Sequence, residues 1–346
     1  MKQVLISLFF ILFLSPICFG QSPDAEGSLV KWMSITEAMQ KNEAQPRPIL
    51  IDFYTHWCGW CKQMMRTTYA NPDLAGYINT NFYPVKFDAE GKDTVEYLGQ
   101  KYMPTSNETR TTHPLALKLL QGKLMYPTTL FLHGFDKQKN EFSLSMLAQG
   151  YLDEKKIQPM LIFTLENAFR NSNFDDFRKE YEAAFEDEQI EARMKDVDWL
   201  KPAAFFTPTM KDSLDKKTLV LIATDWCNTC RVMQRASFSD SLVAAYLNKK
   251  FNLVQFNPQT TEKLYFRKQE FVNTQSAQAP FHQLATALGR NSLTLPSIIL
   301  LDEKLNVLDV IPFFLPPRSL LQIATYYGDD FFRHHTWNEF VAGRKN

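Results

Sequence analysis

The stretch that decides the fold is Thr55-His-Trp-Cys-Gly-Trp-Cys-Lys62, which carries the first Cys-x-x-Cys pair of the chain. An apolar run at 49–54 precedes it, and a segment with helical periodicity and a second apolar run at 82–87 follow it. Strand, helix and strand at this spacing predict a βαβ unit with the two cysteines at the start of its helix.

The same motif recurs as Thr224-Asp-Trp-Cys-Asn-Thr-Cys-Arg231, at an offset of 169 residues (227 minus 58). Ten of the 28 positions in 55–82 are identical at this offset, and Pro127 coincides with Pro296. Solenoid repeats have periods of about 20 to 50 residues, so a period of this length indicates a duplicated domain. We expect two copies of one domain.

The 346 residues are enough for two domains, each with its own core. The expected divisions are a signal peptide at 1–20, a first domain at 28–170, a helical cap and linker at 171–215, and a second domain at 216–346. The linker is rich in Glu, Asp and Lys, with aromatic residues at helical spacing, and predicts helices that cap the first domain.

Each copy is expected to continue in the order βαβαββα with insertions. The first copy predicts helices at 93–102 and 114–121, a strand at 128–133, a hairpin around 136–143 and a last helix from about 153. The second copy predicts strands at 219–223, 252–256 and 297–302, and helices at 281–289 and from about 317.

The N-terminal segment has the layout of a secretory signal peptide, because Lys2 precedes an apolar run at 4–14 and Pro16 and Gly20 follow. A lipidated Cys18 is disfavoured because Ile17, and not a small residue, precedes it. No stretch reaches the roughly 20 apolar residues that span a bilayer, so we expect no transmembrane helix in the mature chain. The expected location is periplasmic or secreted.

Removal of Cys18 with the signal peptide leaves four of the five cysteines, as two Cys-x-x-Cys pairs in a compartment where disulfides form. Zinc is disfavoured because 166 residues separate Cys61 from Cys227, against about 15 to 20 in zinc ribbons. Covalent haem needs a histidine where Lys62 and Arg231 stand. We expect neither a metal nor a cofactor.

The equal numbers of acidic and basic residues disfavour polyanionic partners. Lysine plus arginine and aspartate plus glutamate both number 38, so there is no basic excess to neutralise phosphates. We expect no nucleic-acid partner.

Residues 57–62, with Asp52 six residues before the first cysteine and Tyr126-Pro127-Thr128 later, resemble the thioredoxin superfamily. Residues 226–231 and Leu295-Pro296-Ser297 of the second copy resemble it too, and 236–240 are similar to the C-terminal periplasmic domain of transmembrane thiol-disulfide interchange reductases. The resemblance implies an α/β fold class: two tandem thioredoxin-like domains, each a central mixed sheet flanked by helices, joined by a helical linker. It also implies a protein thiol-disulfide oxidoreductase.

The expected catalytic cysteines lie at helix starts, where free backbone N–H groups and the helix dipole favour a thiolate. Cys58 is the expected nucleophile and Cys61 the thiol that resolves the mixed disulfide, and Cys227 and Cys230 are the corresponding pair. The alternative for either pair is a structural disulfide without turnover.

Asp52 interrupts an apolar strand, where an unpaired carboxylate is costly. The resemblance implies that it lies beneath the cysteines and accepts the proton of Cys61. Leu221 stands at the equivalent position, so we expect slower resolution at the second pair.

The resemblance also implies that two proline bonds are cis and face the cysteines, which leaves the preceding backbone free to pair with an extended substrate. The tryptophan before each first cysteine contacts substrate or shields the sulfur, with core packing as the alternative. The expected substrate-binding residues are Trp57, Tyr126, Pro127, Trp226, Leu295 and Pro296.

The favoured function is an exported oxidoreductase that reduces or exchanges disulfides in extracytoplasmic proteins. Its expected partners are disulfide-containing or dithiol proteins, with a membrane reductant donor as a further candidate. The alternatives are a disulfide oxidase or isomerase, and a non-enzymatic client-binding protein braced by its disulfides. Neither Gly59-Trp60 nor Asn228-Thr229 decides the direction of electron flow.

Overall fold

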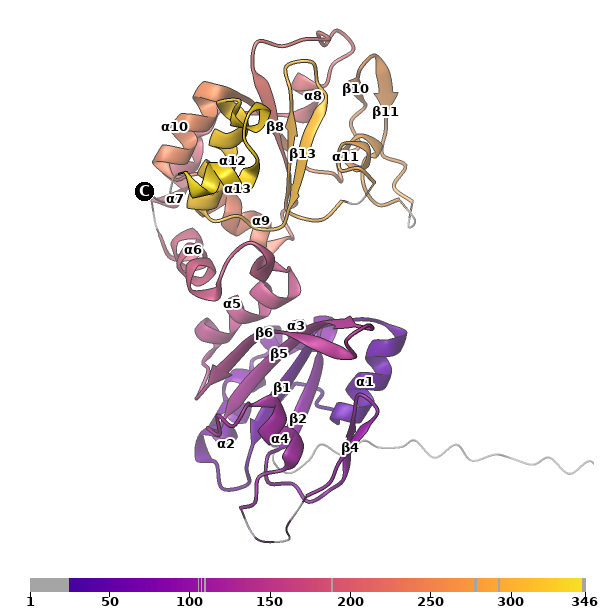
Figure 1. Ribbon diagram of the computed structural model, residues 1–346, viewed down its shortest axis with the longest axis vertical. Coiled ribbons are helices and arrows are strands. Elements are labelled where there is room, and N and C mark those ends of the chain that lie inside the picture. The colour runs from indigo at the N-terminus through magenta and orange to yellow at the C-terminus, as the bar shows by residue number, and fades with distance from the viewer. Residues whose placement is uncertain are drawn as a thin grey trace, which may run out of the picture.

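The computed structural model describes residues 25–343 except 105, 107, 109, 188, 277, 278 and 292. The expected signal peptide at 1–20, with Cys18, lies outside the described residues. Two α/β units follow one another along the long axis of the molecule, with α5 (Glu154–Leu165) and α6 (Phe174–Glu186) between their sheets (Figure 1).

The first unit is built on a mixed sheet of four strands in the order β2-β1-β5-β6. The central strand β1 is parallel to β2 and antiparallel to β5, and all its residues are buried. The strands are β1 (Ile49–Tyr54), β2 (Tyr83–Asp88), β5 (Thr128–Asp136) and β6 (Glu141–Gln149).

Helices cover both faces of this sheet. One buried cluster joins the sheet to α1 (Ile35–Ala44) and α4 (Pro114–Leu119). A second cluster joins the other face to α2 (Gly59–Arg66), α3 (Pro72–Asn81) and α5. The Cys-x-x-Cys segment therefore lies where buried strand β1 passes into α2.

The second unit repeats this arrangement, with β8 parallel to β9 and antiparallel to β12. Its sheet has the order β13-β12-β8-β9-β7, with strands β7 (Trp199–Leu200), β8 (Lys217–Ile222), β9 (Phe251–Phe256), β12 (Ser297–Leu301) and β13 (Val307–Pro312). Its helices are α8 (Pro202–Phe205), α9 (Asn228–Val232), α10 (Ser241–Lys250), α11 (Gln283–Leu288), α12 (Pro317–Gly328) and α13 (Trp337–Ala342), and a π-helical turn, η5 (Met233–Ser237), continues α9. The fold is α/β, with two thioredoxin-like parts, as expected.

Short 3₁₀ segments also lie between the described elements. They are η2 (Thr68–Ala70), η3 (Ala168–Arg170), η4 (Met194–Asp196) and η6 (Phe331–Arg333).

The expected helix at 93–102 is wrong: the segment forms a hairpin of β3 (Val95–Tyr97) and β4 (Gln100–Tyr102). Its two turn residues, Leu98 and Gly99, have φ values of 52° and 76°, and two left-handed residues in succession match the twist of a two-residue hairpin. The second unit repeats the hairpin with β10 (Leu264–Phe266) and β11 (Gln269–Phe271).

The segment at 171–215 contacts the first unit through α6, where the ring centroids of Phe177 and of Phe163 on α5 lie 5.4 Å apart. Phe177 of α6 is fully buried, and its ring centroid lies 5.2 Å from that of Phe314 in the second unit. Further along, α7 (Ile190–Arg193) packs on η5, and β7 adds a parallel edge strand beside β9. The connector thus packs on both units, and its apolar side chains join the core of the second. The domain boundaries themselves stay predictions.

Candidate active sites

Each Cys-x-x-Cys pair forms a disulfide at the start of a helix. We call Cys58 and Cys61 site 1, and Cys227 and Cys230 site 2; their S–S distances are 2.01 and 2.10 Å. The first cysteine of each pair is the N-cap, and its Sγ accepts a hydrogen bond from the backbone N–H of the second cysteine at 3.1 Å. A thiolate at this position would face the positive end of the helix dipole.

A buried ion pair joins β1 and β2 in the unit that carries site 1. Asp52 of β1 is fully buried, and the Nζ of Lys86, its partner in the β1–β2 register, lies 2.5 Å from Oδ2. Burial raises the pKa of Asp52, and the Lys86 ammonium opposes that shift. Among the described residues, Oδ1 has no hydrogen-bond partner. The carboxyl group therefore has an oxygen free to take a proton.

The ammonium links this ion pair to the disulfide. Lys86 Nζ lies 4.3 Å from the ring centroid of Tyr54, and Tyr54 packs in one buried cluster with Cys58 and Cys61. Sequence reasoning identified Asp52 but missed Lys86, whose only signal is a basic residue within the strand at 83–88.

Site 2 lacks both members of the ion pair. Leu221 occupies the equivalent position in β8, and its register partner in β9 is Gln255. The absence of a carboxylate at 221 is the expected difference between the copies, and the loss of the lysine accompanies it.

The recurring prolines both follow cis peptide bonds, Tyr126-Pro127 and Leu295-Pro296, as the resemblance implies. Tyr126 packs against the cluster that contains the site 1 disulfide, and Leu295 lines a cleft at site 2. Their role in substrate binding stays a prediction.

The two site tryptophans lie on the surface, so core packing is wrong for both. Trp57 is 57% exposed and Trp226 is 61% exposed. Each indole N–H donates a hydrogen bond of 3.0 Å, to Glu90 in the first unit and to Gln259 in the second. Exposed rings held beside the sulfurs are suited to contact a polypeptide.

Trp60, within the first dipeptide, was missed as a site residue. It is 64% exposed, and its ring centroid lies 5.5 Å from that of Tyr151. Site 1 therefore carries an aromatic surface on more than one side of the disulfide. The signal was available, because a large apolar residue between the two cysteines occupies the exposed first turn of the helix.

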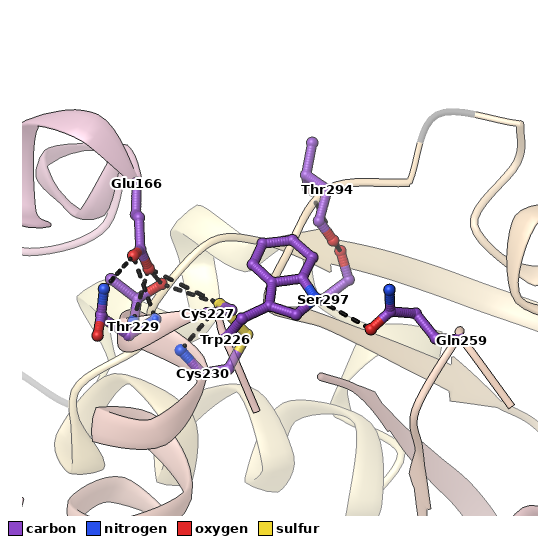
Figure 2. Close-up of a disulfide and its surroundings, with 9 residues drawn as sticks. Glu166, Trp226, Cys227, Thr229, Cys230, Gln259, Thr294 and Ser297 are labelled. Atoms are coloured by element: carbon purple, nitrogen blue, oxygen red, sulfur yellow. Dashed lines mark hydrogen bonds between the residues drawn. A yellow bond between two sulfur atoms is a disulfide. The ribbon is translucent and has the colours of Figure 1, made fainter. Parts of the chain in front are cut away.

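The sequence analysis did not identify Glu166 as a site residue. It is the C-cap of α5, and its carboxylate reaches the start of α9 in the second unit (Figure 2). Oε1 accepts hydrogen bonds from the backbone N–H and the side-chain amide of Asn228, both at 3.1 Å. Oε2 accepts from the backbone N–H and the hydroxyl of Thr229, both at 2.6 Å, and lies 3.7 Å from Cys227 Sγ.

This contact forms one wall of a cleft of about 480 Å³ between the units. The first unit contributes residues from α3 and the end of α5, and the second contributes Trp226, Cys227 and Leu295. Site 2 consequently opens into a space that both units define.

In the part of the chain that the structure describes, no group of three or more His, Cys, Asp or Glu side chains is placed to hold a metal ion. No helix among the described residues has the length and apolar character of a membrane span.

A family model described as Thioredox_DsbH, protein of unknown function, DUF255, matches residues 24–156 and 188–286. Thiol:disulfide interchange protein DsbD of Ralstonia nicotianae is 41% identical over 56 residues. That alignment covers 15% of this chain and 9% of the relative, so the chain corresponds to a small part of that protein.

Three solved structures illustrate the structural comparison. A thioredoxin from Thermus thermophilus is 15% identical over 38% of this chain and 84% of its own, with a TM-score of 0.29. A thioredoxin-fold protein from Helicobacter pylori is 16% identical over 45% and 92%, with a TM-score of 0.32. The C-terminal domain of Neisseria meningitidis DsbD in the reduced form is 18% identical over 37% and 92%, with a TM-score of 0.25.

The two segments that the family model matches cover more than half of the chain, and each contains one Cys-x-x-Cys site. Both sites lie at helix starts next to a cis-proline bond. The chain therefore belongs to the Thioredox_DsbH family, within the thioredoxin superfamily.

Proposed function

We propose that this protein is a thiol-disulfide oxidoreductase that acts outside the cytoplasm, where it reduces or exchanges disulfides in other proteins, with site 1 as its principal catalytic site. The observation that carries the proposal is the buried Asp52–Lys86 pair, which site 1 has and site 2 lacks. The signal-peptide layout of the sequence supports the location.

In the proposed reaction the Cys58 thiolate attacks one sulfur of a substrate disulfide, and the other substrate sulfur leaves as a thiolate that takes up a proton. Cys61 then gives its proton to the Asp52 carboxylate and attacks Cys58 Sγ. The bond between Cys58 and the substrate breaks, and the second substrate sulfur leaves as a thiolate that takes up that proton. The substrate leaves as a dithiol with two more electrons, and the Cys58–Cys61 disulfide remains. A dithiol protein, such as a membrane-bound reductant donor, must restore site 1.

The substrate class follows from the surface around site 1. Trp57 and Trp60 are exposed, and Tyr126 packs beside the disulfide at the cis bond. Aromatic rings of this kind bury apolar side chains at little cost in conformational entropy. An extended polypeptide segment that flanks a disulfide is the substrate we propose.

Insulin reduction by the full chain, with dithiothreitol as electron donor, tests the proposal. Cys58→Ser should remove most of the activity above the uncatalysed rate, whereas Cys227→Ser, the matched change at site 2, should keep most of it. Activity that survives Cys58→Ser would contradict the assignment. A site 1 potential below about −300 mV, with no reaction on insulin, would instead indicate a structural disulfide.

The direction of electron flow needs its own comparison, because an oxidase would run the same exchange in reverse. The reduced chain with insulin and the oxidised chain with a dithiol peptide should be followed under equal conditions. Faster reaction of the reduced chain is expected, and faster oxidation of the peptide would favour the oxidase alternative.

A further inference from the structure

Resting on the proposed role of Cys227 as the attacking sulfur of site 2, we propose that Glu166 is a positioning residue for that site. Its carboxylate, supplied by the first unit, occupies the helix start and disfavours the Cys227 thiolate. Cys227 is then a slow nucleophile. Its reaction rate depends on the position of the first unit relative to α9.

Glu166 accepts hydrogen bonds from the donors at the start of α9. Backbone N–H groups in the first turn of a helix have no partner within the helix, and they attract anions. The N–H groups of Asn228 and Thr229 belong to this set, and both donate to Glu166. The carboxylate thus occupies donors that would otherwise favour a neighbouring thiolate.

The negative charge of Glu166 also acts on Cys227. Glu166 Oε2 lies 3.7 Å from Cys227 Sγ (Figure 2), where Cys227 is buried and Glu166 is half-buried. Two negative charges this close repel strongly at reduced dielectric, so a protonated thiol is favoured over a thiolate. When a dithiol partner reduces site 2, two electrons and two protons enter, and the Cys227 thiol can donate its hydrogen to Glu166.

Among the described residues, no Lys, Arg or His side chain forms an ion pair with Glu166. Burial and the nearby Glu166 carboxylate raise the pKa of Tyr77, so that phenol stays neutral. Arg231 lies with its guanidinium carbon 4.9 Å from the ring centroid of Phe185 on α6. Arg235, in the turn that continues this helix, forms an ion pair with Glu191 of α7. Further titratable groups nearby are Tyr181 on α6, whose pKa burial raises, and Asp225 in the loop before Trp226.

Site 1 supplies the contrast. Gly59, the counterpart of Asn228, has nothing within 4 Å of the place that a Cβ would take, and Trp60, the counterpart of Thr229, is exposed. In the described structure the helix start beside Cys58 is therefore open. The two sites share the N-cap cysteine but differ in the group that faces it.

Packing between the units holds the Glu166 carboxylate at the start of α9. Phe163 of α5, one turn before Glu166, shares a buried cluster with Phe177 of α6 and with the core around Cys227. A displacement of the first unit would withdraw the carboxylate from α9. The reaction rate of Cys227 would then change with the arrangement of the two units.

The test is alkylation of the fully reduced full chain by iodoacetamide between pH 5 and 10, with each cysteine read separately by peptide mass spectrometry. In the unmodified chain, Cys227 should reach half its maximal rate at a higher pH than Cys58. Glu166→Gln keeps the size of the side chain and removes its charge. It should raise the Cys227 rate at pH 7 about tenfold, which corresponds to a shift of about one pH unit.

Two controls isolate the effect. Cys58 in the same sample should not change. Glu182→Gln removes an exposed carboxylate on α6 that pairs with Arg178, and it should leave both cysteines unchanged. If Glu166→Gln fails to fold, Glu166→Asp shortens the side chain and keeps its charge, and a smaller rise in the Cys227 rate is expected.

An unchanged Cys227 profile in Glu166→Gln, or an equal change at Cys58, would overturn the inference. The assay needs no substrate, so it is independent of the insulin test. Faster alkylation of Cys230 than of Cys227 would instead overturn the assignment of the attacking sulfur, and with it the role of Glu166.

Discussion

At the residue scale, site 1 is set apart by a carboxyl group held in an apolar strand. Asp52 is fully buried, and Lys86 is its partner. Sequence alone identified Asp52, because an acidic residue interrupts an apolar run. It did not identify Lys86, because a lysine in a strand is typical of a solvent-facing position until the register between β1 and β2 is known.

The pKa of Asp52 determines a pH dependence of stability. Because burial raises this pKa, the folded chain retains the proton at pH values where the unfolded chain releases it. The free energy of unfolding should therefore fall as pH rises from about 4, the unfolded value, to the raised folded value. Urea unfolding at a series of pH values should show this fall in the unmodified chain and a weaker one in Asp52→Asn. Equal slopes in the two proteins would contradict it.

At the element scale, the two copies place different side-chain pairs at the same register position. Asp52 faces Lys86 between β1 and β2, and Leu221 faces Gln255 between β8 and β9. The same scaffold therefore accepts an ion pair or an uncharged pair. Replacing a buried ion pair with uncharged residues is often neutral or stabilising by about 1–4 kcal/mol.

The variant Asp52→Leu/Lys86→Gln gives site 1 the pair found at site 2. It should keep or increase the free energy of unfolding, and lower insulin reduction by on the order of a hundredfold because the proton acceptor is lost. Urea unfolding and the insulin assay measure the two effects, and the alkylation rate of Cys58 serves as a control on the attacking thiol. Unchanged turnover would remove Asp52 from the mechanism.

The strands and helices near the cysteines were predictable, but the small hairpins were not. The strands at 49–54 and 128–133 and a helix from about 153 were expected from the pattern of apolar runs, and the structure confirms them. The hairpin at 95–102 depends on a left-handed Leu98, and its repeat on left-handed Arg267 and Lys268. None of these residue types signals a left-handed backbone, so the expectation of a helix at 93–102 was wrong.

At the scale of the whole molecule, the two units share apolar packing through the connector. One buried cluster contains Phe163 of α5, Phe177 of α6 and the core of the second unit. Repeat comparison matches each unit with the other and gives no sign of contacts between them. The duplication was therefore predictable, whereas the contact of Glu166 with the start of α9 was not.

Phe177→Ala tests this shared packing. The side chain is fully buried, so its truncation should lower the free energy of unfolding by about 3–5 kcal/mol in urea titration. It should also raise the alkylation rate of Cys227, because α5 loses part of its support. Phe135→Ala, at a partly exposed ring in the β5–β6 hairpin, is the matched control. It should lower the free energy of unfolding much less. Equal losses from the two changes would mean that the connector is not a core element.

The central claim is that the two sites are unequal and that Cys58 is the principal attacking sulfur. The most direct measurement is trapping by the full chain with Cys61→Ser and Cys230→Ser, in which neither site can resolve a mixed disulfide. After incubation with a disulfide-containing protein, peptide mass spectrometry counts the adducts at each remaining cysteine. The account predicts adducts mainly at Cys58, with fewer at Cys227 and an increased share there when Glu166→Gln is added. Adducts confined to Cys227, or absent from both cysteines, would contradict it.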